Sequence, residues 1–372
     1  MTSRKVPFFD YPRAYLDERE KLLEIVDDVG QRGAFIMQQD LRDFEQKLAE
    51  YTGARYAIGV ANATDGLELS WMALGLKPGD EVICCSHTML ATAAAIQLAG
   101  GVPVPVELGD DNLIDPDAVE AAINSRTVGI MPTQLNGRTC DMDRIMSIAS
   151  KNRLFVVEDA AQALGSRFKG RHAGTFGDAA AISFFPAKVL GCLGDGGGVI
   201  TSDYDIYDRI YQLHDHGRDR EGELKSWGRN SRLDNLQAAI LNYRFGAYDK
   251  VIDRRREIAA IYQQRLGDMQ ELQLPPAPDS DPDHFDIYQN YELQADNRDE
   301  LKQFLADAGI GTLVQWGGKG VHQWENLGFN LELPRVEAFF RRCIMLPMNM
   351  FVTDDDIDYV CGRIRNFYGK SH

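Results

Sequence analysis

The stretch Ala180-Ala181-Ile182-Ser183-Phe184-Phe185-Pro186-Ala187-Lys188 carries an apolar, strand-like run directly into a lysine. A loop dense in glycine follows at residues 191–198. Solvated lysines seldom have such surroundings, whereas a lysine that forms a Schiff base needs a dry, fixed position with room for a cofactor. A lysine that snorkels from a strand end is the structural alternative. The flanking glycines favour the chemical interpretation of Lys188.

A second strand-like run lies upstream, in Val156-Val157-Glu158-Asp159-Ala160-Ala161-Gln162. Its acid, Asp159, could reach the same pocket as Lys188. A pyridoxal phosphate (PLP) enzyme needs this pair, because a lysine binds the aldehyde and a carboxylate pairs with the pyridinium nitrogen. Gln162 could then hydrogen-bond the phenolic oxygen of the cofactor. The alternative for Asp159 is an acid that caps the next helix.

Short, β-rich runs alternate with helical patterns from about residue 55 to residue 203. They are bounded by Gly, Pro, Asp or Asn and span residues 56–60, 81–85, 102–106, 128–132, 154–157, 180–184 and 198–201. Helices are expected between them, for example over 64–74 and 141–151. This alternation predicts an α/β domain with a mainly parallel sheet covered on both faces. Ligands bind beyond the carboxyl ends of such strands, which is where Asp159 would lie.

The rest of the chain predicts a second, smaller α+β domain. A long charged helix is expected over 247–266 and a linker at the proline-rich stretch 275–282. The elements expected beyond it are a strand over 288–295 and helices over 298–308 and 353–368. We therefore predict a large domain at residues 1–246, which begins with a helical segment around Leu41, and a smaller domain at residues 247–372.

Composition excludes several classes of protein. The 372 residues are 44% hydrophobic and 26% charged, which is typical of a soluble globular protein. A net charge of −16 argues against nucleic-acid binding, which requires clustered Lys and Arg. No run approaches the roughly 18 apolar residues of a membrane span. The charged start lacks a signal-peptide core, so we expect a cytoplasmic location. The six cysteines are scattered, so neither a metal site nor a disulfide framework is expected.

Two further segments could reach the same cofactor. Residues 62–67 form a small-residue turn between a strand and a helix, where free backbone N–H groups, aided by Thr64, suit an anion. The hydroxyl of Ser183 could also reach a phosphate. Residues 227–237 follow a charged loop and open another helix. For both segments the alternative is a simple helix cap.

Three motifs together resemble the PLP-dependent sugar-nucleotide aminotransferases, the DegT/StrS group of fold-type I enzymes. They are EDAAQALG at 158–165, GTFGDAAAISFFPAKVLGCLGDGG at 174–197 and NSRLDNLQAAIL at 230–241. Their order and spacing match the family, and the resemblance runs from about residue 33 to the C-terminus. It implies a large domain with a mainly parallel seven-stranded sheet between helices, and a smaller C-terminal α+β domain.

The resemblance also implies roles for individual residues. Lys188 would be the catalytic Schiff-base lysine, Asp159 would pair with the pyridine nitrogen, and Gln162 would lie near the phenolic oxygen. The phosphate would be held by Ala63, Thr64, Ser183 and, from a neighbouring subunit, Asn230. Such enzymes are homodimers with shared active sites.

Two segments depart from the family pattern. Residues 85–89 read Cys-Ser-His-Thr-Met where the family often has an aromatic residue that stacks on the cofactor ring. Met89 falls on that position, and His87 is the alternative. Residues 315–322 read Gln-Trp-Gly-Gly-Lys-Gly-Val-His in place of a segment like YPxPxH, which contacts substrate. The candidate substrate residues are His87, Arg229, Trp316, Lys319 and His322, and a surface loop is the alternative for the last three.

The function implied is transfer of an amino group from L-glutamate to a keto group of a nucleotide-linked deoxysugar, with PLP passing through pyridoxamine phosphate. A PLP-dependent sugar dehydratase on the same fold has a histidine in place of the lysine, so Lys188 argues against it. An aminotransferase for a non-nucleotide cyclic ketone stays open. A non-catalytic regulator with the same fold would be expected to have lost Asp159 or Lys188.

Overall fold

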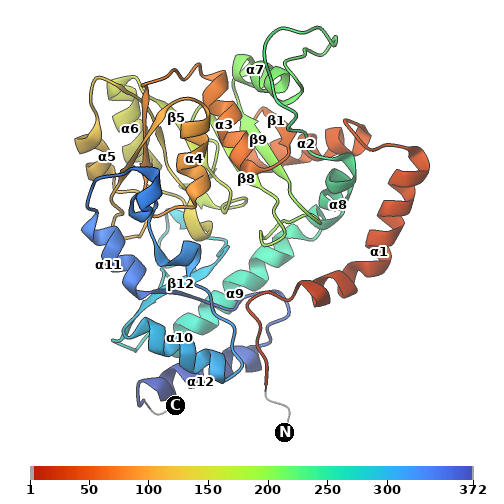
Figure 1. Ribbon diagram of the computed structural model, residues 1–372. Coiled ribbons are helices and arrows are strands. Elements are labelled where there is room, and N and C mark those ends of the chain that lie inside the picture. Colours follow the sequence, from red (N-terminus) through yellow and green to blue (C-terminus); the bar gives the residue numbers. More distant parts are fainter. Residues whose placement is uncertain (1–3, 371–372) are drawn as a thin grey trace.

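The computed structural model of the chain describes residues 4–370 and is built around one seven-stranded sheet (Figure 1). Its strands are β1 (Tyr56–Val60), β2 (Glu81–Cys85), β3 (Val102–Val106), β4 (Thr127–Met131), β5 (Phe155–Asp159), β8 (Ala179–Ser183) and β9 (Gly197–Thr201). They lie in the order β1-β9-β8-β5-β4-β2-β3. The predicted runs overlap all seven strands, and the α/β fold class is confirmed.

The strand β9 is the exception to the parallel arrangement. It runs antiparallel to both of its neighbours, β1 and β8, whereas the remaining neighbours pair in parallel. Parallel pairing requires a crossover connection, usually a helix. The link between β8 and β9 is the glycine-dense loop and contains no helix, so the chain turns back on itself. Lys188 lies in this returning loop.

Helices cover both faces of the sheet, and alternate residues of each strand point to opposite cores. On one face Val82, Met131 and Val157 pack with Trp71, which lies on α3. The helices of this face are α3 (Ala63–Ala73), α4 (Leu90–Leu98) and α7 (Tyr204–His214). Those of the other face are α2 (Gln39–Thr52), α5 (Pro116–Ala122), α6 (Met142–Asn152) and α8 (Asn235–Phe245). The sheet is therefore dry on both sides, and its polar side chains gather at the strand ends.

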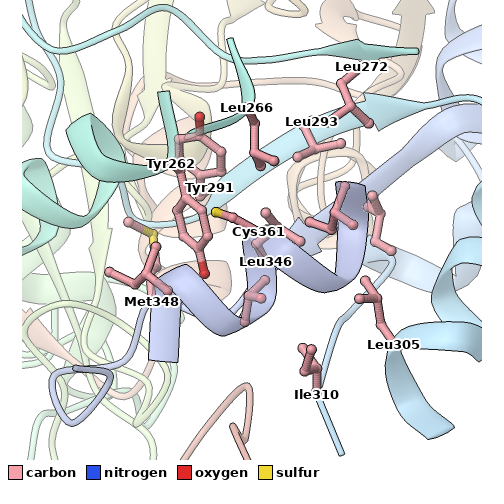
Figure 2. Close-up of a cluster of buried hydrophobic side chains, with 14 of the residues drawn as sticks. Tyr262, Leu266, Leu272, Tyr291, Leu293, Leu305, Ile310, Leu346, Met348 and Cys361 are labelled. Carbon is pink, nitrogen blue, oxygen red and sulfur yellow. The ribbon is translucent and has the colours of Figure 1, made fainter. Parts of the chain in front are cut away.

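A second hydrophobic core lies in the C-terminal part (Figure 2). Its antiparallel sheet has the order β10-β12-β13, and α9, α10 and α12 pack on it. The elements are α9 (Tyr248–Leu266), β10 (Leu272–Gln273), β12 (Tyr291–Ala295), α10 (Arg298–Asp307), β13 (Cys343–Leu346) and α12 (Asp354–Phe367). Tyr248 at the start of α9 belongs to the core beside the large sheet, and Leu266 at its end belongs to the second core. The helix α9 thus joins the two.

The predicted domain boundary falls between α8 and α9. The N-terminal residues, which the same prediction assigns to the large domain, reach the second core, because Val6 is buried there and forms a bridge with Ile310. The boundary itself stays a prediction.

Further short elements lie between those already named. They are β6 (Arg167–Phe168), β7 (Arg171–His172), β11 (His284–Phe285) and α11 (Pro334–Arg342).

The sequence did not predict α1 (Tyr11–Arg32), the red helix at the side of the molecule in Figure 1. Its first turn is capped by Asp10 and carries Pro12, but along its length only Leu22 and Val29 are buried. Leu22, Val26 and Val29 recur at helical spacing, but most of the large apolar side chains of α1 are exposed, namely Tyr11, Tyr15, Leu16, Leu23 and Val26. Although α1 has 22 residues, no helix within residues 4–370 has both the length and the apolar character needed to cross a membrane.

We predict that Leu305→Ala destabilises the protein by about 2–5 kcal/mol, because Leu305 is fully buried in the second core and truncation leaves a cavity. Chemical denaturation followed by circular dichroism measures the effect. The control is Leu98→Ala at the end of α4, where the side chain is largely exposed and the change should stay within about 0.5 kcal/mol. Equal stability of the two variants would contradict the assigned core.

Candidate active site

Asp159 is the last residue of β5 and is buried. Its Oδ2 accepts a hydrogen bond from Thr92 Oγ1 at 2.6 Å, and its Oδ1 accepts one from the backbone N–H of Ala161 at 3.2 Å. Burial raises the pKa of Asp159, and these hydrogen bonds and the nearby positive charge of Lys188 oppose the rise. A buried carboxylate held in this way is suited to face a cationic group.

Three threonines lie behind Asp159, and sequence reasoning missed them. Thr88 Oγ1 lies 2.6 Å from Thr92 Oγ1 and 2.9 Å from Thr133 Oγ1. All three side chains are buried. The threonine chain fixes the hydroxyl that donates to Asp159. The only available signal was the spacing of Thr88 and Thr92 by one helical turn, directly after a strand end.

Lys188 lies in the loop after β8 and is partly buried. Its backbone N–H donates to the Phe185 carbonyl at 2.8 Å, which closes a tight turn. Burial lowers the pKa of Lys188 to about 8, and the negative charge of Asp159 opposes this shift. The amine is therefore neutral in a far larger fraction of molecules near physiological pH than that of an exposed lysine, which favours a nucleophilic role.

Gln162 lies in the turn after β5, and its amide is oriented by two donors. Its Oε1 accepts from the backbone N–H of Asn136 at 2.9 Å and from Nδ2 of Asn290 at 3.3 Å. A backbone N–H can only donate, so the amide oxygen must face it. The NH2 group of Gln162 consequently points away from these two donors.

The predicted phosphate residues converge at the start of α3. Asn62 caps this helix by accepting from the Asp65 N–H at 2.8 Å, and Ala63 and Thr64 form its first turn. Ser183 pairs with Gly197 across β8 and β9. A Cβ on Gly197 would lie 2.4 Å from the carbonyl carbon of Asn62, so only glycine lets β9 pass this close. This arrangement brings Ser183 to the helix N-terminus, a ready-made anion site.

The segment that contains Asn230 reaches the same helix. Ser231 Oγ donates to Asp65 Oδ2 at 2.7 Å, and Arg229 is paired with the buried Glu68 on α3. Asn230 itself is exposed. The preceding loop, which links α7 to α8, projects from the body of the molecule in Figure 1. Trp227 in this loop is 95% exposed.

The two candidates for stacking on a cofactor ring have different surroundings. Met89 precedes α4 and is 49% exposed. His87 is buried against Phe339 and Trp316, and its Nδ1 lies 2.8 Å from the Asn112 carbonyl. Its Nε2 lies 3.5 Å from Glu292. Met89 is therefore accessible, whereas His87 is enclosed by protein groups.

The glycine-rich segment after residue 315 is held by its side chains. Trp316 lies at φ 48° and packs on His87 and Phe340. His322 is buried, with Nδ1 2.7 Å from Ser86 Oγ and Nε2 3.4 Å from Glu337. Both ring nitrogens of His322 thus face protein groups. Lys319 is exposed and lies 5.1 Å from the ring centroid of Trp324.

A cavity of about 1090 Å³ lies next to the lysine loop. Its lining includes Lys188, Asn290 and the aromatic residues Phe9, Tyr11 and Phe351. Asp159, Gln162 and the start of α3 are not in the lining. The cavity therefore includes Lys188 but does not extend to those groups.

Together these residues fit PLP. The start of α3 with Ser183 offers a cradle for a phosphate, Asp159 offers a buried carboxylate for the ring nitrogen, and Lys188 offers an amine with a lowered pKa. In this fit, the hydrogen-bonding groups of the chain that would contact PLP are already held in position by other residues. It involves Gln162 as well, because its NH2 group is free to meet an oxygen.

Comparison with known proteins supports this interpretation. The model of the DegT/DnrJ/EryC1/StrS aminotransferase family matches residues 16–365. A dTDP-3-amino-3,4,6-trideoxy-alpha-D-glucose transaminase of Streptomyces venezuelae is 37% identical over 350 residues, which cover 92% of this chain and 91% of that protein. A pleiotropic regulatory protein of Geobacillus stearothermophilus is 35% identical over 371 residues, which cover 98% of each.

The fold agrees with that of solved aminotransferases. The crystal structure of S. venezuelae DesV in complex with a ketimine intermediate superimposes with a TM-score of 0.94 at 35% identity. The match covers 100% of both chains. The large sheet, the C-terminal unit and the segments that carry the candidate residues therefore have counterparts in one known architecture.

We predict that the apo-protein captures PLP at Lys188 with a rate that rises with pH and levels off above about pH 8. The neutral amine is the nucleophile, and the pKa of Lys188 is lowered to about 8. Stopped-flow absorbance measures the rate, and N-acetyl-lysine is the reference that corrects for ionisation of PLP itself. In Asp159→Asn the levelling should move to lower pH, since a charge that raises the lysine pKa is lost. A rate that still rises at pH 10, as for an exposed lysine with a pKa of about 10.4, would contradict the assignment.

Proposed function

We propose that this chain, which belongs to the DegT/DnrJ/EryC1/StrS aminotransferase family, transfers an amino group from L-glutamate to a keto group of a nucleotide-linked deoxysugar. The chain is a PLP-dependent transaminase. The observation that carries the proposal is the pair of the partly buried Lys188 and the buried Asp159, which follow the carboxyl ends of adjacent strands. The sugar-nucleotide transaminase at 37% identity supports the choice of substrate class.

Each residue of the site has a part in this reaction. When bound, PLP supplies a ring that accepts electrons as a bond to the substrate carbon breaks. Asp159 keeps a proton on the ring nitrogen, and the threonines behind it hold its carboxylate in place. Gln162 donates to the phenolic oxygen. Met89 packs on the ring with its polarisable sulfur. Ala63, Thr64, Ser183 and Asn230 hold the phosphate.

Lys188 has two successive tasks. It first binds the cofactor through its amine. As a free amine it would then hold a proton and move it between the substrate carbon and C4′ of the cofactor. A pKa of about 8 lets one nitrogen serve as base and acid near neutral pH. Lys188 and Asp159 are both retained, which favours transamination over the regulatory role suggested by the name of the Geobacillus relative.

The substrate carries a diphosphate, and the protein has a net charge of −16. Positive charges and hydrogen-bond donors near the site must therefore outweigh the negative electrostatic field of the whole protein. Arg229 is already neutralised by Glu68, whereas Lys319 is paired with an aromatic ring and keeps its charge for a ligand. We infer that Lys319 and Trp316 face the substrate. His87, Arg229 and His322 are engaged with protein groups and would act on the substrate through neighbouring side chains.

We also propose amination at C3 of the sugar, as in the name of the Streptomyces relative. The protein would act as a homodimer with shared active sites, located in the cytoplasm. An aminotransferase for a non-nucleotide cyclic ketone is the second candidate. It is favoured by the glycine-rich segment at residues 315–320, where the chain departs from the family pattern.

We predict that the protein purified with PLP is yellow and that L-glutamate removes its visible band. Incubation with glutamate and a panel of dTDP-, UDP- and GDP-linked 3-keto and 4-keto sugars should give an amino sugar, detected by mass spectrometry. Lys188→Ala should lower turnover by at least about 10³-fold, because the residue that transfers the proton is lost. Its control is Lys302→Ala, an exposed lysine on α10. Turnover of free cyclic ketones alone would select the second candidate, and a protein that stays colourless with PLP would refute both.

We predict that Lys188→Ala and Asn230→Ala subunits complement each other. If Asn230 crosses the dimer interface to the partner's phosphate site, a mixed dimer contains one site with neither substitution. Mixing the two inactive or impaired proteins under conditions of subunit exchange should then restore activity above the sum of the separate proteins. Activity that never exceeds that sum would place Asn230 at the phosphate site of its own chain, beside Ser231 and Asp65.

A further inference from the structure

Gln289 holds the backbone on both sides of Lys188. Its Nε2 donates to the Ala187 carbonyl at 2.9 Å, and its Oε1 accepts from the Val189 N–H at 3.0 Å. The side chain of Gln289 is buried. One amide thus satisfies a donor and an acceptor that the turn leaves open, and it fixes the peptide groups from which the lysine side chain projects.

The next residue, Asn290, holds Gln162. Its Nδ2 donates to Gln162 Oε1 at 3.3 Å and to Asn136 Oδ1 at 2.8 Å. Asn136 adds its own backbone N–H to Gln162, from a left-handed conformation with φ 55°. Asparagine adopts this conformation more readily than other residues with a side chain. The oxygen of Gln162 therefore faces two donors, and its NH2 group points away from them.

A buried network fixes the orientation of Asn136. Its Nδ2 donates to Glu292 Oε2 at 2.6 Å, and its Oδ1 also accepts from Gln315 Nε2 at 3.1 Å. Gln315 in turn donates to Glu292 Oε1 at 2.9 Å. Because the carboxylate of Glu292 can accept only, the amide of Asn136 must point its nitrogen toward it. Rotation of this amide would break several bonds at once.

The segment that carries Gln289 and Asn290 is itself held firmly. The guanidinium of Arg255 on α9 donates to the carbonyls of Tyr288 and Gln289 at 2.8 and 2.6 Å. Tyr291, the residue after Asn290, is packed in the second core (Figure 2). The C-terminal unit thus supplies a rigid support to two residues of the active site that lie in the large sheet domain.

We propose that Gln289 and Asn290 are positioning residues, of which Gln289 sets the position of Lys188 and Asn290 sets the orientation of Gln162 toward the phenolic oxygen of PLP. The inference about Asn290 rests on the role proposed above for Gln162. The two consecutive residues align the lysine and the amide with the same cofactor. Neither needs to touch substrate or cofactor to do so.

The pH midpoint of the cofactor absorbance band in the holoenzyme tests Asn290. A hydrogen bond donated to the phenolic oxygen lowers the affinity of that oxygen for the proton it shares with the Lys188 nitrogen. Loss of the donor should therefore raise the pH midpoint of the band. We expect Asn290→Leu and Gln162→Leu each to raise it by about one to two pH units, the size of one hydrogen bond to a charged group. Asn290→Asp should raise it at least as much, because Asp accepts and would draw the Gln162 NH2 group toward itself.

A double-mutant cycle separates positioning from a general structural effect. If Asn290 acts through Gln162, Asn290→Leu should cause no further shift in the Gln162→Leu background. Additive shifts, or an unchanged midpoint in Asn290→Leu while Gln162→Leu moves it, would overturn the inference alone. An unchanged midpoint in Gln162→Leu would instead refute the contact of Gln162 with the cofactor, and the inference about Asn290 with it.

PLP binding to the apo-protein tests Gln289 independently. We expect Gln289→Met, which keeps the length of the side chain and removes both hydrogen bonds, to raise the dissociation constant of PLP about tenfold. The matched control is Asn366→Leu, an exposed position on α12, which should leave affinity and band unchanged. Thermal melting of the apo-proteins verifies that each variant is folded. A folded Gln289→Met protein with unchanged PLP affinity would overturn the role of Gln289.

Discussion

The site depends on two consecutive carboxylates that are buried at the end of one strand. Glu158 and Asp159 point to opposite faces of the sheet because side chains alternate along β5. Glu158 is fully satisfied on one face, where it accepts from the N–H groups of Gly174, Phe176 and Gly177 and from the amide of Gln134, at 2.7–2.8 Å. Asp159 on the other face has two such donors. Equal burial with fewer donors leaves Asp159 suited to a cationic partner, and in the proposed function that partner is the pyridinium nitrogen.

The fold brings the other groups to this carboxylate by different means. The parallel pairing of β5 with β8 places the lysine loop beside Asp159. The antiparallel return of β9 then brings Gly197 against the start of α3, so that the phosphate cradle forms at the same edge. The C-terminal unit adds the last constraint through Gln289 and Asn290. A tilt of that unit relative to the sheet would move the lysine and Gln162 together, which couples the two units to the chemistry.

The sequence allowed the central sheet to be predicted well, because each buried strand is a short apolar run with breakers at both ends. Lys188, Asp159 and Gln162 could be found because their motifs are local. The direction of β9 could not be predicted, since a glycine-rich loop reveals that the chain turns but not which strand it joins. The partners of Gln162 and Lys188 were also beyond reach. Asn290 lies 128 positions from Gln162, and Gln289 lies 102 positions from Ala187, so no periodic pattern links them. The helix α1 was missed although Leu22, Val26 and Val29 recur at helical spacing.

The same network explains why His87 is a poor candidate for stacking despite its place in the motif. Its Nδ1 faces a carbonyl and must carry a proton there, so the remaining nitrogen faces Glu292 at 3.5 Å. Glu292 is already committed to Asn136 and Gln315. Swinging His87 toward the cofactor would leave a buried carboxylate and a buried carbonyl without these neighbours, at a cost that a stacking contact does not offset. Met89 has no such commitments, because it lies at the open start of α4 and carries no polar group to satisfy. The hydrogen bonds behind the site therefore hold His87 in its enclosed position and leave Met89 uncommitted.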